Sequence, residues 1–213
     1  MARRPHGFTL IELLVAISIL AIVAVLGWRG LDSIVRARIA LTADMEQTRG
    51  MQLAFAQLQR DCIQIAPFST IPNRAPLVAE EGRLLLVRNV YADNQPSRLQ
   101  VVAYRVREGV LTRHESIATR DLKEIDTAWL AAASDATLPQ AVALQSGVDN
   151  ITMRVWSSDG SGWRTGAAGV APTVPQPQLS SNATQTVLTG LEVSLKVKGL
   201  GLPMQKIFLL GAT

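Results

Sequence analysis

Cysteine and histidine are nearly missing from this sequence of 213 residues. Cys62 is the only cysteine, so no intramolecular disulfide can form. His6 and His114 are the only histidines, and the chain therefore cannot supply the usual ligand set of a zinc site at suitable spacing. The same scarcity argues against a Ser-His-Asp triad, and we interpret His114 as an exposed strand residue. No glycine loop followed by lysine precedes a helix, which excludes that type of nucleotide site. We expect the chain not to be an enzyme.

Dense acidic loops are also missing. The carboxylates that a calcium ion could use lie in short turns, as in Asp93 with Asn94, Asp149 with Asn150, and Asp159 among glycines. A dedicated calcium site gathers more oxygen ligands than these turns offer, so turn chemistry is the favoured interpretation. We expect no cofactor, and calcium binding stays open without support.

Positive charge is present but not concentrated. The formal net charge is +4, and Arg3 and Arg4 supply two of those charges from the first seven residues. The arginines of the second half are scattered, which is typical of a solvated strand surface rather than a nucleic-acid interface. They are Arg83, Arg88, Arg98, Arg105, Arg107 and Arg113. We expect no nucleic-acid partner.

A long apolar run is the most informative feature that is present. It covers 19 residues from Phe8 to Leu26 and contains a single charged residue, Glu12. As a helix it would reach about 28 Å, close to the thickness of a bilayer's hydrocarbon core. An ionised carboxylate there costs roughly 2.5 to 3.5 kcal/mol and needs a partner, yet the run holds no lysine or arginine. Cleavage after Gly7 would place a new amino group on Phe8, level with Glu12 of a shifted neighbouring copy. The pattern indicates an assembling subunit.

Three other interpretations of this segment compete with assembly. A secretory signal usually has a shorter apolar stretch and ends at a small-x-small site, which Val25-Leu26-Gly27-Trp28 is not. A twin-arginine signal is suggested by Arg3-Arg4 but not by the residues that follow. A plain membrane anchor remains, with Glu12 reaching toward the lipid headgroups.

Helical character continues beyond the apolar run, with no proline between Pro5 and Pro67. We predict one helix from about Phe8 to Ile65. Its end carries a stripe at helical spacing that predicts burial and makes Cys62 a core residue. The stripe is Met51, Phe55, Leu58, Cys62 and Ile65. Charged residues of the second half are predicted to face water. They are Asp32, Arg36, Arg38, Asp44, Glu46, Arg49, Arg60 and Asp61.

After Pro67 the pattern changes to alternating β-branched and aromatic residues. The predicted strands are 84–90, 99–107 and 110–115, joined at Glu108-Gly109, then 141–144, 148–156, 191–197 and 203–210, with a short helix at 122–133. Asp159 to Gly162 is predicted as a turn, and Gly166 to Thr184 as an exposed loop. The fold class is α+β, a long N-terminal helix followed by a mostly antiparallel β head.

The string Gly7-Phe8-Thr9-Leu10-Ile11-Glu12 resembles the processing site of the type IV pilin superfamily. The resemblance implies that a prepilin peptidase cuts after Gly7 and methylates Phe8, and that Glu12 pairs with the amine of an adjacent subunit. It also implies a leader at 1–7, a membrane half at 8–26, a periplasmic helical half at 27–65 and a periplasmic head at 66–213. The chain would cross the bacterial inner membrane once, with its N-terminus in the cytoplasm.

Further segments resemble the J-type minor pseudopilins of type II secretion. The matching strings are Trp28 to Arg38, Leu58 to Asp61, Leu99 to Val106, Gly109 to Arg113, Gly147-Val148, Met153 to Trp156, Asp159-Gly160 and Trp163. This resemblance implies a subunit at the tip of the periplasmic pseudopilus, beside I-type and K-type minor pseudopilins and the major pseudopilin. Its role would be to help start assembly and export folded proteins. Glu12 speaks against the K type, which characteristically lacks it, but does not separate the J type from the I type.

Two rival functions remain at this point. A minor type IV pilin has the same leader and helix but primes a surface pilus for adhesion, motility or DNA uptake. A membrane-tethered periplasmic enzyme would use the head as a catalytic domain, and the missing catalytic residues argue against it.

Overall fold

The computed structural model describes residues 8–71, 75–134, 138–158, 162–165 and 188–211. The predicted loop at 166–184 and most of the predicted turn at 159–162 lie outside these residues. The helices and strands are α1 (Leu10–Ile63), β1 (Leu77–Glu80), β2 (Arg83–Ala92), β3 (Gln95–Arg107), β4 (Val110–Glu115), α2 (Leu122–Ala133), β5 (Val142–Ser146), β6 (Val148–Ser157), β7 (Gly162–Thr165), β8 (Leu188–Val197) and β9 (Met204–Leu209).

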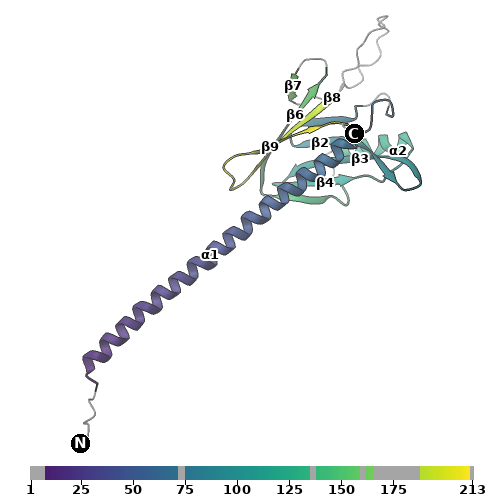
Figure 1. Ribbon diagram of the computed structural model, residues 1–213. Helices are drawn as coiled ribbons and strands as arrows, with labels where there is room; N and C mark the ends of the chain where they lie inside the picture. The colour runs from purple at the N-terminus through teal and green to yellow at the C-terminus, as the bar shows by residue number, and fades with distance from the viewer. Residues whose placement is uncertain (1–7, 72–74, 135–137, 159–161, 166–187, 212–213) are drawn as a thin grey trace, which may run out of the picture. The chain divides into compact units, whose positions relative to one another are not determined.

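The predicted long helix is confirmed as α1, a single element of 54 residues (Figure 1). It begins directly after Thr9 and ends four residues before Pro67, so the proline-free stretch sets its length. The chain divides within α1 into two parts, residues up to 48 and residues from 49 on. The first part is helical from Leu10, and by length and composition α1 could cross a membrane. The second part holds the rest of α1 and both sheets.

The strands form two antiparallel sheets. The first sheet has the order β1-β2-β3-β4-β5 and the second has the order β7-β6-β8-β9. The predicted hairpin between β3 and β4 is confirmed, and its turn residues Glu108 and Gly109 have φ of 50° and 74°. Two left-handed residues in a two-residue loop match the twist of the strands on either side. The edge strands β1 and β7 were not predicted, because four residues are too few to show alternation.

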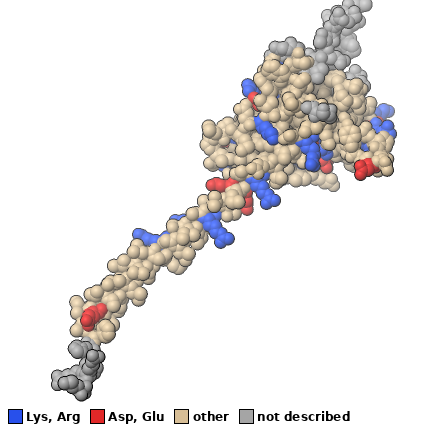
Figure 2. Space-filling view, in the orientation of Figure 1, with Lys and Arg blue, Asp and Glu red and all other residues tan. Residues whose placement is uncertain are grey.

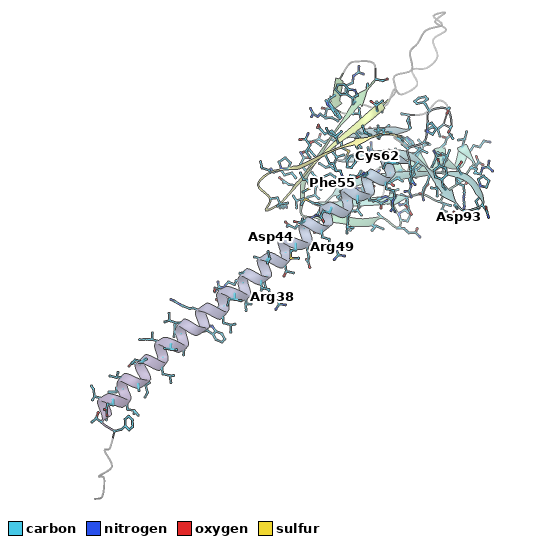
Figure 3. All side chains as sticks on the ribbon, in the orientation of Figure 1. Arg38, Asp44, Arg49, Phe55, Cys62 and Asp93 are labelled. Carbon is cyan, nitrogen blue, oxygen red and sulfur yellow. The ribbon has the colours of Figure 1, made fainter. Side chains whose placement is uncertain are left out.

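The main core lies between the two sheets and the end of α1. The predicted helical stripe is confirmed, since Met51, Phe55, Leu58 and Cys62 are all buried in this core and Ile65 packs against it. Phe55 and Cys62 are labelled on α1 in Figure 3, where the helix meets the strands. Burial of this stripe fixes the last part of α1, from Met51 on, to the β head through apolar contacts.

A second core covers the other face of the first sheet. It is formed with α2, which was predicted at residues 122–133 and is confirmed there, and Figure 1 shows α2 beside β3. Asp121 caps α2 by accepting a hydrogen bond from the Lys123 backbone nitrogen at 2.8 Å. Ile125 and Ala132 of α2 are buried against β2 and β3. The first sheet is therefore covered on both faces.

The predicted alternation in the second sheet is confirmed with one exception. Ile151, Met153 and Val155 of β6 are buried, and so are the predicted residues of β8. Glu192 was assigned to the solvated face of β8, but only 6% of it is exposed. Its carboxylate is bonded to Arg154 of β6, which explains how an acid is accommodated there.

Candidate functional site

The first turn of α1 holds the residues on which the assembly prediction depends. Phe8 is 88% exposed, and Gly7 lies outside the described residues. The Thr9 backbone nitrogen and the Thr9 hydroxyl both donate to Glu12 Oε2 at 2.9 Å, and the Glu12 nitrogen donates to Thr9 Oγ1 at 3.4 Å. This reciprocal pattern is a capping box, which satisfies backbone groups left open at a helix start.

The capping box was not predicted, although the sequence carries its signature. Thr9-Leu10-Ile11-Glu12 has the required threonine and glutamate three residues apart. Glu12 therefore has a local role in its own helix besides any role between subunits. Thr9 donates hydrogen bonds but carries no positive charge, so the capping box leaves the charge of Glu12 uncompensated. Figure 2 shows one red patch on the tan surface near the N-terminal end of the described helix, in agreement with the single acidic residue of the run from Phe8 to Leu26.

The side chains of α1 beyond the apolar run remain largely apolar and exposed. This exposed set continues past Leu26 and is unusual for a helix of a soluble monomer. Its members are Trp28, Leu31, Ile34, Val35, Ile39, Leu41 and Met45. Such a helix needs lipid or other helices around it, which agrees with a subunit that assembles along α1.

A buried ionic cluster, which we call the Asp61 cluster, connects the end of α1 to the first sheet. Asp61 is fully buried and accepts hydrogen bonds from both flanking arginines. Arg88 Nη1 donates to Asp61 Oδ1 at 2.7 Å, and Arg113 Nε donates to Asp61 Oδ2 at 2.9 Å. The Tyr104 hydroxyl donates to the same Oδ2 at 2.5 Å. Glu115 completes the cluster by accepting from Arg113 at 2.7 Å and from Arg88 at 3.3 Å.

The register of the first sheet brings these residues together. Leu84 pairs with Tyr104, which pairs with Arg113, so their side chains share one face of the sheet. Arg88 lies on the same face because it follows Leu84 by an even number of residues. Two arginines and two carboxylates balance in charge, which a buried ionic group requires.

The surroundings also fix the protonation of the cluster's donors. Burial and the neighbouring Asp61 charge raise the pKa of Tyr104, so its hydroxyl keeps the proton that it donates. Burial alone would lower the pKa of Arg113, but its hydrogen bonds to Asp61 outweigh this and the pKa is raised. Tyr104 and Arg113 therefore stay protonated throughout the physiological range.

The predictions for these residues were wrong. Asp61 was predicted to face water, and Arg88 and Arg113 were predicted to lie on a solvated strand surface. Arg105 is buried as well, and its guanidinium donates to the carbonyl oxygens of Ala132 and Ser134 at the end of α2. Periodicity could have corrected the error for Asp61, which follows Leu58 by three residues on the buried stripe.

The other candidate residues are not assembled into a site in the described part of the chain. His114 was predicted to be exposed but is half-buried, and its Nδ1 has no hydrogen-bond partner among the described residues. Asp149 pairs with Lys196 at 3.0 Å, and Asn94 takes a left-handed turn conformation with φ of 56°. Asp159 lies outside the described residues. No group of three metal-ligating side chains occurs among the residues that the structure describes.

The buried thiol of Cys62 gives a direct test of this packing. Burial and the neighbouring Asp61 charge raise the pKa of Cys62 to about 12, so the thiolate that reacts with iodoacetamide is suppressed. We expect no labelling of the folded chain at pH 8, and rapid labelling in urea once the head unfolds. Mass spectrometry measures both, with the Cys62→Ser variant as the blank. Rapid labelling without denaturant would contradict the buried position.

Known proteins resemble both the N-terminal segment and the remainder of the chain. Residues 2–28 match a family model described as the prokaryotic N-terminal methylation motif. Residues 29–210 match the model of the type II secretion system (T2SS), protein J. The chain is also similar to the type II secretion system protein J of Klebsiella pneumoniae, with 30% identity over 124 residues. That match covers 53% of this chain and 63% of the relative, which is less than two thirds of the relative's length.

The family model over residues 29–210 and the Klebsiella pneumoniae relative both name type II secretion, so the alternative of a type IV pilin is not favoured. The first sheet, the second sheet and the Asp61 cluster all lie within the matched region. Because the protein J model covers well over half of the sequence, the chain belongs to the family of the type II secretion system protein J.

Proposed function

We propose that the chain is a minor pseudopilin at the tip of the type II secretion pseudopilus, where it helps to initiate assembly and the export of folded proteins from the periplasm. The observation that carries this proposal is the combination of the family match with a lone carboxylate, Glu12, in the first turn of an exposed apolar helix. We propose no catalytic role and no cofactor, calcium included.

The proposed topology follows the chain from its N-terminus. The leader at 1–7 stays in the cytoplasm, residues 8–26 cross the inner membrane, and the head lies in the periplasm. A prepilin peptidase cuts after Gly7 and methylates Phe8. The freed amine of a neighbouring subunit then neutralises Glu12, which removes the cost of an unpaired charge in an apolar surrounding.

Assembly and identity depend on different parts of the chain. The exposed aliphatic residues of α1 supply a surface that other helices can cover as the subunit leaves the lipid. The Asp61 cluster and the stripe around Phe55 hold the β head in one orientation on the end of α1. The partners proposed for this head are the I-type and K-type minor pseudopilins, followed by the major pseudopilin.

Coexpression tests the proposed partners directly. The full chain, solubilised in detergent, should copurify with coexpressed I-type and K-type pseudopilins of the same secretion system. A minor type IV pilin subunit from the same cell serves as the negative control. If the chain recovered the pilin and not the pseudopilins, the proposed function would be wrong.

Processing gives an independent prediction. Mass spectrometry of the mature protein should find a chain that begins at Phe8 and carries one added methyl group. The Gly7→Val variant should retain the leader, because a β-branched side chain replaces the smallest residue at the cut. An intact leader in the native chain, or cleavage near Gly27, would contradict the assignment.

A further inference from the structure

The outer face of the second sheet, which points away from the main core, carries a row of apolar side chains. Val155, Leu191 and Phe208 face the core, so their neighbours along each strand face outward. The register aligns Trp163 with Trp156, Trp156 with Gly190 and Gly190 with Leu209. A single row of β7, β6, β8 and β9 residues therefore crosses the whole sheet.

This row is exposed and aromatic. Trp156 is 40% exposed and Leu209 is 66% exposed, and the two indoles of Trp156 and Trp163 meet edge to face with their ring centroids 5.4 Å apart. Gly190 keeps the row shallow, since a Cβ atom there would lie only 3.2 Å from Trp156 Cβ. Ile207 is 56% exposed on the next row. Tryptophan is among the residues that contribute most binding energy in protein interfaces.

The charged side chains next to this row are already paired with residues of the same chain. Arg154 donates two hydrogen bonds to Glu192, at 2.6 and 2.7 Å, and its guanidinium lies 5.7 Å from the Trp163 ring centroid. Lys206 of β9 is bonded to Gln59 of α1 at 3.0 Å and lies over Phe208, on the other side of the strand. A partner of this face therefore needs no compensating charge, and a charged partner would lose solvation without gaining an ion pair.

The edge of the second sheet at β9 is also open. Of the four sheet edges in the described residues, β1 and β7 have only four residues each, and β5 has an irregular register with β4. β9 has six residues in continuous register with β8 and is the last strand in the order of its sheet. It lacks the shortness, proline or bulge that usually protects an edge strand.

The free backbone groups of β9 can be assigned from the ladder. The Leu210 nitrogen donates to the Thr189 oxygen at 3.0 Å, which directs the backbone groups of even-numbered residues toward β8. The N–H and C=O groups of Gln205, Ile207 and Leu209 are then directed away from β8. No described strand pairs with this side of β9.

We propose that the free edge of β9 and the adjoining Trp156 row bind a strand from the head of a neighbouring minor pseudopilin, a strand whose side chains over this face are apolar and uncharged. This inference rests on the proposed function. The added strand bonds to the backbone of Ile207 and Leu209, and its side chains pack beside the exposed side chains of these two residues. Trp156 lies on β6, two strands further into the sheet, so the rest of the partner's head covers it. The Arg154 and Glu192 pair is buried by this contact without needing a new partner.

Backbone hydrogen exchange tests the proposal on the full chain in detergent, alone and in complex with coexpressed I-type and K-type pseudopilins. In the chain alone, the amides of Gln205, Ile207 and Leu209 should exchange as readily as unpaired amides. In the complex their exchange should slow by about tenfold or more, because each becomes part of a ladder. The amides of Phe208 and Lys206, already paired with β8, serve as internal references.

The Ile207→Lys variant gives a second readout. A lysine there places an unpaired charge in the contact. The amount of I-type and K-type pseudopilin that copurifies should fall by about tenfold, equivalent to about 1.4 kcal/mol of binding free energy. Ile117→Lys is the matched control, because Ile117 is 89% exposed outside the second sheet. Both variants alter exposed side chains, and their urea midpoints should equal that of the native chain.

The other outcomes contradict either the proposed function or the inference about β9. If the native chain recovers no companion, the proposed function fails and this inference with it. If it recovers both companions while Ile207→Lys does the same and the β9 amides stay unprotected, only the inference fails. Protection in the dilute chain alone would mean that another segment of this chain covers β9. Protection that grows with the concentration of this chain alone would mean that a second copy does.

Discussion

The Asp61→Asn variant is expected to lower the free energy of unfolding of the head by about 3 to 5 kcal/mol, the usual cost of leaving a buried charge without its partner. Asp61 is fully buried, and Arg88 and Arg113 both donate to it. Asparagine keeps the size of the side chain but removes the charge. Glu115, which is half exposed, would then be the one carboxylate that both guanidinium groups contact among the described residues.

Urea unfolding of the full chain in detergent, followed by tryptophan fluorescence of the head, measures this loss. Asp44→Asn is the matched control, since Asp44 lies on the same helix but is exposed, as labelled in Figure 3. Its effect should stay within about 0.5 kcal/mol, as for most surface substitutions. Equal midpoints for the two variants would show that the Asp61 cluster does not hold the head on α1.

Arg113→Met provides a check on the cause. Removing one arginine leaves Asp61 with Arg88 and Tyr104, so the carboxylate keeps one ion pair and one hydroxyl donor. The loss should be smaller than for Asp61→Asn. In the double variant, the two losses should not add, because the residues belong to one network.

The fold was predictable where apolar residues kept one helical or strand spacing without interruption. The absence of proline up to Pro67 defined α1, the alternation around Ile151 defined β6, and the Glu108-Gly109 turn defined the hairpin of β3 and β4. Each of these signals is local, so it does not depend on which elements later meet. The bounds of α2 agreed for the same reason, since Asp121 caps it locally.

The buried charges were not predictable in the same way. Arg88 and Arg113 lie on the core face by strand alternation, but whether an arginine on that face is buried depends on what α1 places opposite it. That partner, Asp61, lies 27 residues from Arg88 and 52 from Arg113 in the sequence. A charged residue with no visible partner is normally assigned to solvent. Only the packing of α1 on the first sheet brings the charges together.

From the sequence alone, Glu12 was interpreted only as a carboxylate that needs a positively charged partner. The apolar run made Glu12 conspicuous, and its pairing with a processed Phe8 remains a prediction. The capping box adds a second, local explanation for the same residue. An experiment that only removes the side chain of Glu12 cannot separate the two roles, so the variants need to be chosen for that purpose.

The Glu12→Gln variant is expected to abolish export almost completely while leaving α1 intact. Glutamine can accept the hydrogen bonds of Thr9, so the capping box is kept. It carries no charge, so it cannot neutralise the amine of an adjacent subunit. If charge pairing drives assembly, Glu12→Gln and Glu12→Ala should therefore fail equally, although only the second loses the cap.

Thr9→Ala is the complementary variant. It removes the hydroxyl that donates to Glu12 Oε2 and leaves the charge in place. Loss of a capping residue costs about 1 kcal/mol of helix stability, which a helix of 54 residues can absorb. Export should remain near the native level. Secreted protein in the medium, together with the companions recovered from detergent extracts, measures all three variants.

The order of the three variants decides between the two roles. Charge pairing predicts that Thr9→Ala exports well and that Glu12→Gln does not. Capping alone predicts the reverse, because the Glu12→Gln variant would retain the reciprocal hydrogen bonds and the Thr9→Ala variant would lose those of the hydroxyl. Normal export by Glu12→Gln would refute the assembly role of the carboxylate, since the only property removed is the negative charge that the amine of a neighbouring subunit is proposed to meet.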